Sequence, residues 1–160
     1  MSIKPVIRVQ RDDFDIAREI ELATAGHPGV GAVVTFSGIC RDDGGSLAAL
    51  ELEHYPGMAE RAINEIALEA AERWPLQAIT VIHRFGRVAP GENIVLVLAA
   101  SAHRQAAFDG AAFLMDFLKS KAPFWKKLIA ADGRDGGWVD AKESDDEALQ
   151  RWRAAEEPER

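Results

Sequence analysis

The chain of 160 residues lacks several features that mark exported or membrane-bound proteins. Its single cysteine, Cys40, cannot form a disulfide within the chain, which fits a reducing compartment. The sequence has no run of about 18 apolar residues and no basic n-region followed by an apolar stretch. We therefore expect a cytoplasmic protein without a membrane segment.

Motifs for metals and nucleotides are also missing. No two of the four histidines stand at HxH or HxxxH spacing, and with only one cysteine this predicts no metal site. Neither a Walker A sequence nor a GxGxxG sequence is present. The net charge of −7 argues against bulk binding of nucleic acid. We expect no metal, no resident cofactor and no nucleic-acid partner.

One stretch departs from this acidic balance. Between Lys119 and Lys127 the chain has four lysines and no acidic residue. A basic island in an acidic protein favours a specific anion site over a general polyanion surface.

Apolar periodicity and turn residues divide the chain into strands and helices. Strands are predicted at 3–10, 32–40, 46–55, 77–86, 93–101 and 138–142, and helices at 12–25, 58–74, 102–120 and 144–155. Pro5 makes the first strand an edge strand, whereas 32–40 is expected to be buried and 93–101 to be central. The segment 131–137 is predicted to be a loop.

Two pairs of strands are separated by short turns, at 41–45 and 87–92. Such connections suit antiparallel hairpins and are too short for parallel crossovers. We therefore expect an α+β fold of antiparallel β-hairpins packed with helices, α/β-hammerhead-like, as a single domain over 1–160. Residues 155–160 are predicted to be a frayed tail.

The helix predicted at 102–120 has an apolar stripe that ends in charge. The stripe residues stand three or four apart and are Arg104, Phe108, Ala111, Met115 and Leu118. Lys119 continues the stripe and has two interpretations. In a partly buried pocket its pKa would be lowered, so that it could act as nucleophile, acid or base. Alternatively it is a solvated cation that offsets the helix dipole.

His103 and Arg104 open the same helix, where free N–H groups and the dipole favour anions. The alternative is a surface arginine paired with an acid and a histidine packed on the sheet. The two ends of the helix are nearly 30 Å apart at about 1.5 Å per residue, so one small ligand cannot reach both within one chain. A dimer would bring them together.

Arg41, on a loop after a strand, either binds a ligand or is a solvated arginine. Phe124 and Trp125 are most simply core anchors, with a platform for a flat ring as the alternative.

Several stretches together closely resemble one known family. They are GAVVTFSGICRD, LELEHYPGMAE, RWPLQAITVIHRFGRVAPGE, SAHRQAAFDGAAFLMDFLKSKAPFWKK and WVDAKESD, and they span about residues 31–145. They resemble the large, catalytic subunit of molybdopterin synthase, the MoaE family. The resemblance implies a sulfurtransferase of molybdenum-cofactor biosynthesis, with two large subunits as the homodimer core of a heterotetramer.

The resemblance also implies the partners and the reaction. A small ubiquitin-like carrier would insert its C-terminal Gly-Gly thiocarboxylate. Two sulfurs would be transferred to cyclic pyranopterin monophosphate, forming the dithiolene of molybdopterin. Lys119 and Lys126 match the catalytic lysines of the family.

Four more residues match substrate-binding positions of the family. His103 and Arg104 match its substrate-pocket pair, and Arg41 matches an arginine that reaches the phosphate from the dimer mate. Lys142 stands where the family often has arginine.

Leu128 departs from the family, which commonly has glutamate directly after FWKK. A carboxylate that pairs with the lysines is therefore either absent from this chain or supplied by Asp132 or Asp135 from the following loop. This departure leaves an alternative open, a non-catalytic paralogue that binds the Gly-Gly tail of the carrier or a pterin. An unrelated anion-binding α+β domain is a more distant alternative.

Overall fold

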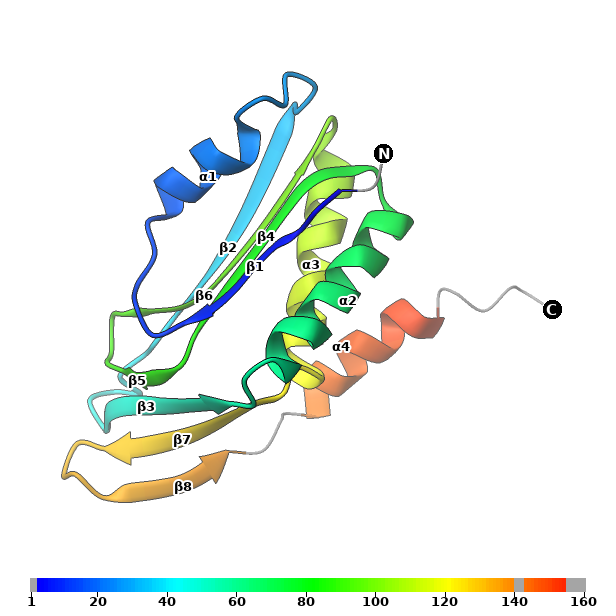
Figure 1. The fold of residues 1–160 in the computed structure, drawn as a ribbon. Coiled ribbons are helices and arrows are strands. Elements are labelled where there is room, and N and C mark those ends of the chain that lie inside the picture. Colours follow the sequence, from blue (N-terminus) through cyan, green and yellow to red (C-terminus); the bar gives the residue numbers. More distant parts are fainter. Residues whose placement is uncertain (1–2, 140–142, 155–160) are drawn as a thin grey trace.

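A computed structural model describes residues 3–139 and 143–154 of the chain (Figure 1). The described residues form eight strands in two sheets and four helices, which confirms the α+β fold. Lys142 and the predicted frayed tail at 155–160 lie outside the described residues. Among the described helices, none combines the length and the apolar character needed to cross a membrane.

The larger sheet, here called sheet A, has the strand order β1-β4-β6-β2. Its strands are Val6–Gln10 (β1), Leu76–Arg84 (β4), Asn93–Ser101 (β6) and Ala32–Ile39 (β2). β4 and β6 pair antiparallel, as the short turn between them predicts. β1 is an edge strand, as predicted, but it pairs with β4 in parallel.

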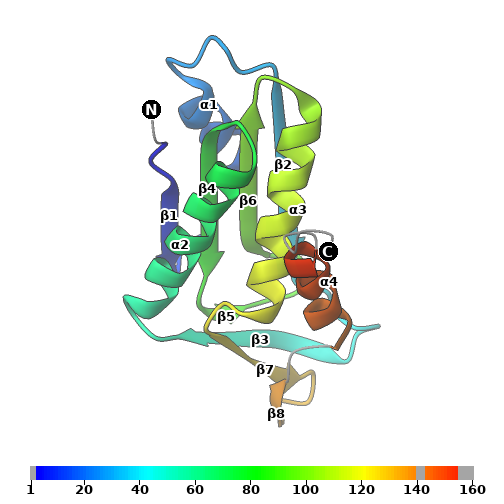
Figure 2. The same ribbon diagram turned by 90° about the vertical axis from the view of Figure 1, so that its right-hand side faces the viewer.

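Helices cover both faces of sheet A (Figures 1 and 2). Their bounds are Ile16–Thr24 (α1), Met58–Arg73 (α2) and Arg104–Ser120 (α3). α1 contacts β4 and β6, while α2 and α3 lie side by side on the opposite face. Because β6 is covered on both faces, every residue from Val95 to Ser101 is buried, as expected for a central strand.

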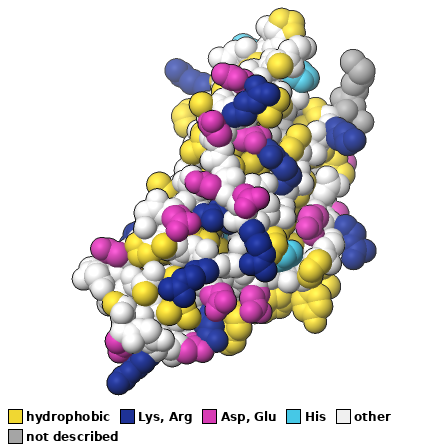
Figure 3. All heavy atoms as spheres, turned by 60° about the vertical axis from the view of Figure 1, so that its left-hand side comes forward, with side chains coloured by type: hydrophobic (Ala, Val, Ile, Leu, Met, Phe, Trp, Pro, Cys, Tyr) yellow, Lys and Arg dark blue, Asp and Glu magenta, His cyan; other side chains and the backbone are white. Residues whose placement is uncertain are grey.

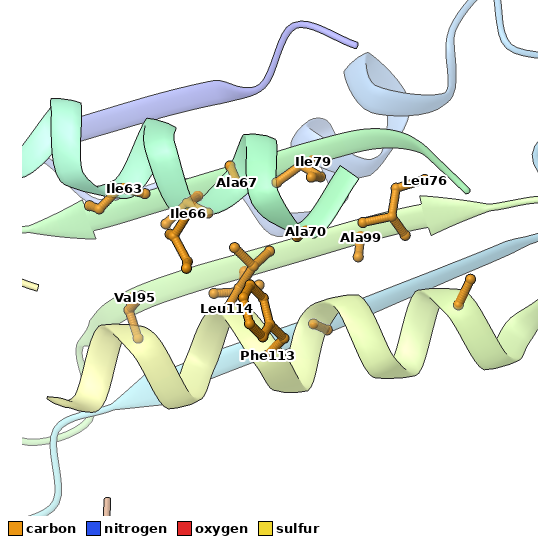
Figure 4. Close-up of a cluster of buried hydrophobic side chains, with 14 residues drawn as sticks. Ile63, Ile66, Ala67, Ala70, Leu76, Ile79, Val95, Ala99, Phe113 and Leu114 are labelled. Atoms are coloured by element: carbon orange, nitrogen blue, oxygen red, sulfur yellow. The ribbon is translucent and has the colours of Figure 1, made fainter. Parts of the chain in front are cut away.

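The main core lies between sheet A and the helices α2 and α3 (Figure 4). Ile63 of α2 and Leu114 of α3 are fully buried in it. Gly110 lets α3 approach the sheet closely, because a Cβ there would lie 2.9 Å from Leu76 Cδ1. The predicted stripe of α3 is wrong at Phe108, which is 57% exposed, since small residues and not this ring face the sheet.

The second sheet, sheet B, crosses beneath one end of sheet A (Figure 2). Its order is β5-β3-β7-β8, with bounds Gly86–Val88 (β5), Leu47–His54 (β3), Phe124–Ala130 (β7) and Asp135–Val139 (β8). A small second core gathers here. Its buried members are Cys40, Leu47, Leu50, Leu52 and Val88.

The predicted hairpin of 32–40 with 46–55 is wrong. β2 pairs with β6 of sheet A, whereas β3 pairs with β5 and β7 of sheet B. The turn at 41–45 therefore carries the chain from one sheet to the other. The prediction that β2 is buried is also wrong. Among the described strands β2 stands at the edge of sheet A, next to β6, and its residues Phe36 and Ile39 are 41% and 53% exposed.

β7 was not predicted, because two adjacent lysines interrupt its apolar pattern. The strand predicted at 138–142 is β8, which begins at Asp135, so the loop before it is shorter than expected. β5 begins at the last residue of the strand predicted at 77–86 and extends into the segment 87–92, which was predicted to be a turn.

The last helix, α4 (Glu143–Ala154), confirms the helix predicted at 144–155 and packs against α3. The indole Nε1 of Trp152 donates a hydrogen bond to Asp116 Oδ2 at 2.6 Å. Ser120 Oγ at the end of α3 donates to the carbonyl of Asp145 at 2.6 Å. α4 therefore fixes the end of α3 that carries Lys119.

Candidate functional site

The basic island spans the end of α3 and the start of β7. Lys119 lies in the last turn of α3, where a cation offsets the helix dipole, and its side chain is exposed. The helix ends at Ser120, because Pro123 disfavours helical backbone in the residue before it. β7 begins at Phe124. This short connection keeps Lys119 near the strand that carries Lys126.

Lys126 lies on a largely apolar face of sheet B. Residues of β3 and β7 that stand opposite one another share a face, and the pairs are His54–Phe124, Leu52–Lys126 and Leu50–Leu128. Leu50, Leu52 and His54 alternate along β3 and therefore share this face. Half-buried Lys126 therefore stands between an aromatic pair and an aliphatic pair, and its stem runs through apolar surroundings.

Position 128, where the chain departs from the family, packs into the second core. Leu128 is half-buried and contacts this cluster. The two carboxylates that could replace a glutamate have other partners. Asp135 Oδ2 lies 2.5 Å from Lys127 Nζ, and Asp132 Oδ2 lies 3.4 Å from Arg134 Nε. Lys127 is one residue from Lys126 on β7, so its side chain points to the opposite face.

Cys40, directly before Arg41, lies close enough to Lys126 to be affected by its charge. Burial raises the pKa of the Cys40 thiol, and the positive charge of Lys126 acts in the opposite direction. Lys126 is thus close enough to affect the residue directly before Arg41. The Arg41 side chain itself is exposed. The structure brings Arg41, Lys119 and Lys126 to the same end of the molecule.

His83 of β4 lies where the two sheets meet. The pKa of His83 is lowered to about 4, mainly by burial and to a smaller extent by the charges of Lys119 and His54, while the hydrogen bond to the Arg84 carbonyl acts in the opposite direction. The ring is therefore neutral near pH 7. Lys119 must lie near it for its charge to act there.

Aromatic rings gather around His83. The ring centroids of His83 and Phe124 are 3.8 Å apart with an interplanar angle of 13°. His54 stacks on Phe124 at 6.1 Å and contacts Phe85 at 4.5 Å. Phe124 is thus a core anchor, as predicted, whereas Trp125 is 44% exposed and contacts Tyr55 on the other face.

This cluster of rings was not predicted from the sequence. His54 and His83 fall within the strands predicted at 46–55 and 77–86, and the spacing of the four histidines predicts no metal site. The available signal is that both histidines lie inside stretches that resemble the family, LELEHYPGMAE and RWPLQAITVIHRFGRVAPGE.

His103 and Arg104 lie far from this cluster, at the other end of α3. Both are exposed, and His103 caps the helix without a side-chain hydrogen bond. Arg104 and Lys119 are about 22 Å apart along the helix at 1.5 Å per residue. Within one chain the structure does not bring this pair to the lysines.

The remaining predictions concern metals and broad charged surfaces. Across residues 3–139 and 143–154, no group of three or more His, Cys, Asp or Glu side chains is placed to hold a metal ion. Lysines and arginines are interspersed with acids on the face shown in Figure 3.

A cavity of about 300 Å³ adjoins the site, lined by Arg11, Glu51, Leu52, Glu53, His54, Phe85 and Gly86.

The sequence is similar to those of known proteins over most of its length. The sequence pattern of the MoaE protein family matches residues 9–121. A protein of Mesorhizobium japonicum named molybdopterin synthase catalytic subunit is 64% identical over 155 residues, which cover 97% of this chain and 98% of that protein. The protein of the same name from Rhizobium meliloti is 63% identical over 152 residues, covering 95% of this chain and 98% of its own.

A solved structure also shares the fold. The molybdopterin biosynthesis MoaE protein from Burkholderia ambifaria superposes with a TM-score of 0.81 and 46% sequence identity, covering 94% of this chain and 99% of that one. Similarity in sequence and in fold extends over nearly the whole chain, which therefore belongs to the MoaE protein family.

Proposed function

We propose that this chain is the catalytic, sulfurtransferase subunit of a cytoplasmic molybdopterin synthase. It takes sulfur from the C-terminal thiocarboxylate of a small ubiquitin-like carrier and transfers it to cyclic pyranopterin monophosphate, and two such transfers form the dithiolene. The family membership and the names of the relatives support this reaction. The observation that carries it is the placement of Lys119 and Lys126 at one junction, beside aromatic rings.

The charge and shape of this junction suit the two reactants. The substrate has a phosphate and a flat pterin, and the carrier tail is anionic. Lysines attract both anions, and the rings of His54 and Phe85 line the adjoining cavity.

The two lysines would have different tasks. Lys119, exposed at the end of α3, would lie next to the terminal carbonyl of the carrier and stabilise the tetrahedral intermediate or move a proton. Lys126, half-buried in sheet B, would assist proton transfer at the carbon skeleton of the pterin.

Further chains would complete the site. Lys119 is open to solvent in the single chain, whereas electrostatic stabilisation is strongest where water is excluded. The carrier tail would cover it from one side. A second copy of this chain would supply His103 and Arg104, or Arg41, which cannot all reach one small ligand from one chain. This supports a homodimer core within a heterotetramer, and Lys142 would join the substrate-binding residues.

A non-catalytic paralogue is the second candidate, and Leu128 is the observation that favours it. Where the family commonly has a carboxylate, this chain has a side chain packed into the second core. Such a protein would bind the Gly-Gly tail or the pterin without turnover.

Reconstitution in vitro separates these possibilities. The purified chain is mixed with thiocarboxylated carrier and cyclic pyranopterin monophosphate, and dithiolene product is assayed. We expect product from the wild type and a loss of about 100-fold or more in the Lys119→Ala variant, with carrier binding retained. Binding without product in the wild type would favour the paralogue.

Two neighbouring lysines provide matched controls. Lys121 is exposed just past the end of α3, and Lys127 points away from Lys126. Lys121→Ala should therefore keep the activity that Lys119→Ala loses, and Lys127→Met the activity that Lys126→Met loses. Wild-type product formation by Lys119→Ala would refute its assignment.

A further inference from the structure

His83 is a buried, titratable side chain that the proposed reaction does not use. It stands next to the end of β4, is 8% exposed, and its Nδ1 lies 2.8 Å from the carbonyl oxygen of Arg84. Because a carbonyl oxygen only accepts, Nδ1 must carry the hydrogen of the neutral ring. This hydrogen bond fixes the orientation of the imidazole.

The ring of His83 joins the two sheets through Phe124. His83 belongs to sheet A and Phe124 to sheet B, and their rings lie nearly parallel with centroids 3.8 Å apart. On sheet B, Phe124 stands opposite His54, whose ring contacts Phe85 at 4.5 Å. The first residue of β7 is therefore held from both sheets.

Phe124 also stands between the two lysines in the chain. It follows Lys119 by five residues and precedes Lys126 by two, on the same face of β7 as Lys126. The link from α3 to Phe124 is short, so the position of this ring sets where Lys126 stands relative to Lys119. A displacement of about 1 Å between reacting groups can cost on the order of a hundredfold in rate.

We propose that His83 is a positioning residue, whose neutral ring stacks on Phe124 and thereby fixes Lys126 relative to Lys119. This rests on the proposed sulfur transfer, because it assigns His83 a part in that reaction through the two lysines. A neutral ring suits this place, since a buried imidazolium would add a second positive charge close to Lys119.

The shape of the side chain at position 83 provides the test. His83→Phe keeps a flat ring against Phe124, whereas His83→Leu keeps apolar bulk without the flat ring. In the complex with thiocarboxylated carrier, we expect His83→Leu to lower kcat about tenfold or more, with KM for carrier and pterin nearly unchanged. His83→Phe should restore kcat to within a few-fold of the wild type.

A control and a coupled variant separate positioning from general destabilisation. Val81→Ala removes buried volume from the same strand, two residues away, and should leave kcat unchanged once the protein is folded. Phe124→Leu should lower kcat as His83→Leu does, and the double variant should lose no more than either. Unchanged kcat in His83→Leu, equal losses in His83→Phe and His83→Leu, or an equal loss in Val81→Ala would each overturn the proposal.

A readout independent of activity keeps this test apart from that of the function itself. In NMR spectra, the ammonium signal that disappears in Lys126→Met identifies Lys126. We expect this signal to shift in His83→Leu and to stay near its wild-type position in His83→Phe. Absence of product from the wild type would count against the sulfur transfer alone, whereas an unmoved Lys126 signal in His83→Leu would refute the positioning role.

Discussion

Sheet A and sheet B differ most in how far the rest of the chain covers them. Helices contact both faces of sheet A, and its central strand β6 is buried from Val95 to Ser101. In sheet B, every residue of β7 is half-buried or exposed. A fully covered strand leaves no room for a hydrated ammonium, whereas a half-covered one can hold the stem of Lys126 among apolar side chains. The covered sheet thus serves as scaffold, and the open one carries Lys126, for which we propose a role in proton transfer.

The largest expected effect measures this difference directly. Leu98 of β6 is fully buried, so Leu98→Ala should lower the free energy of unfolding by about 2–5 kcal/mol. Leu128→Ala on half-buried β7 should cost about 1 kcal/mol, because less contact is lost and water fills the space. Urea unfolding of both variants measures the difference. Equal costs would show that sheet B is as tightly packed as sheet A.

The same contrast explains how much of the fold the sequence predicts. The helices α2 and α3, the central strand β6 and its hairpin with β4 follow from strong periodicity and a short turn. The strands that pair with β2 and β3 cannot be predicted in this way, because a turn such as 41–45 can close a hairpin or carry the chain into another sheet. Tertiary packing decides between the two, and no local residue distinguishes them.

For the candidate site, the family resemblance named the residues and the structure placed them. It was the resemblance that singled out Lys126, because a lysine inside β7 gives no apolar alternation to detect. Spacing along α3 correctly separated Lys119 from Arg104. The stack of His83 on Phe124 joins residues 41 positions apart in the chain, which periodicity within one element cannot reveal.

His83 connects the two sheets and should make stability depend on pH. Its pKa is about 4 in the folded chain, against an ordinary value of 6.5. Between these pH values the unfolded chain binds a proton that the folded chain does not, so the free energy of unfolding falls as pH falls. This loss of stability due to His83 is absent above about pH 6.5 and reaches roughly 3 kcal/mol once the pH is below about 4.

His83→Phe removes this titration and keeps the ring. Urea unfolding of both proteins at several pH values between 7 and 4 gives the difference, and this isolates His83 from the carboxylates that titrate in both. We expect the wild type to lose more stability than the variant across this range. Parallel curves would show that His83 titrates normally in the folded chain.

Two tryptophans extend the comparison at smaller magnitude. Trp152 of α4 packs beside Trp74 and Phe113, and its indole donates to Asp116. Trp152→Phe keeps a ring but loses this hydrogen bond, which should cost about 1–3 kcal/mol. Trp138 on β8 is 52% exposed, so Trp138→Phe should change stability by less than about 0.5 kcal/mol. Thermal melts of the two variants provide the measurement, and a larger loss at Trp138 would reverse the ranking of the two regions.

The smallest expected effect concerns Asp135, at the open edge of sheet B. Lys127 lowers the pKa of the Asp135 carboxyl through a hydrogen bond, and the pKa of Lys127 is raised in turn. The ionised form of Asp135 is thus more favourable in the folded chain than in the unfolded chain. Its stabilising contribution is present above the ordinary pKa of about 4 and disappears as pH falls through the lower folded value.

Because half of the Asp135 side chain is exposed, Asp135→Asn should hardly change the melting temperature at pH 7, and less still in high salt. Its effect on sulfur transfer is more informative, since Asp135 was one candidate to replace the glutamate missing at position 128. The carboxylate binds Lys127, whose side chain points away from the face of Lys126. Product formation should therefore continue at the wild-type rate, and a strong loss would mean that Asp135 turns toward Lys126 once the substrates are bound.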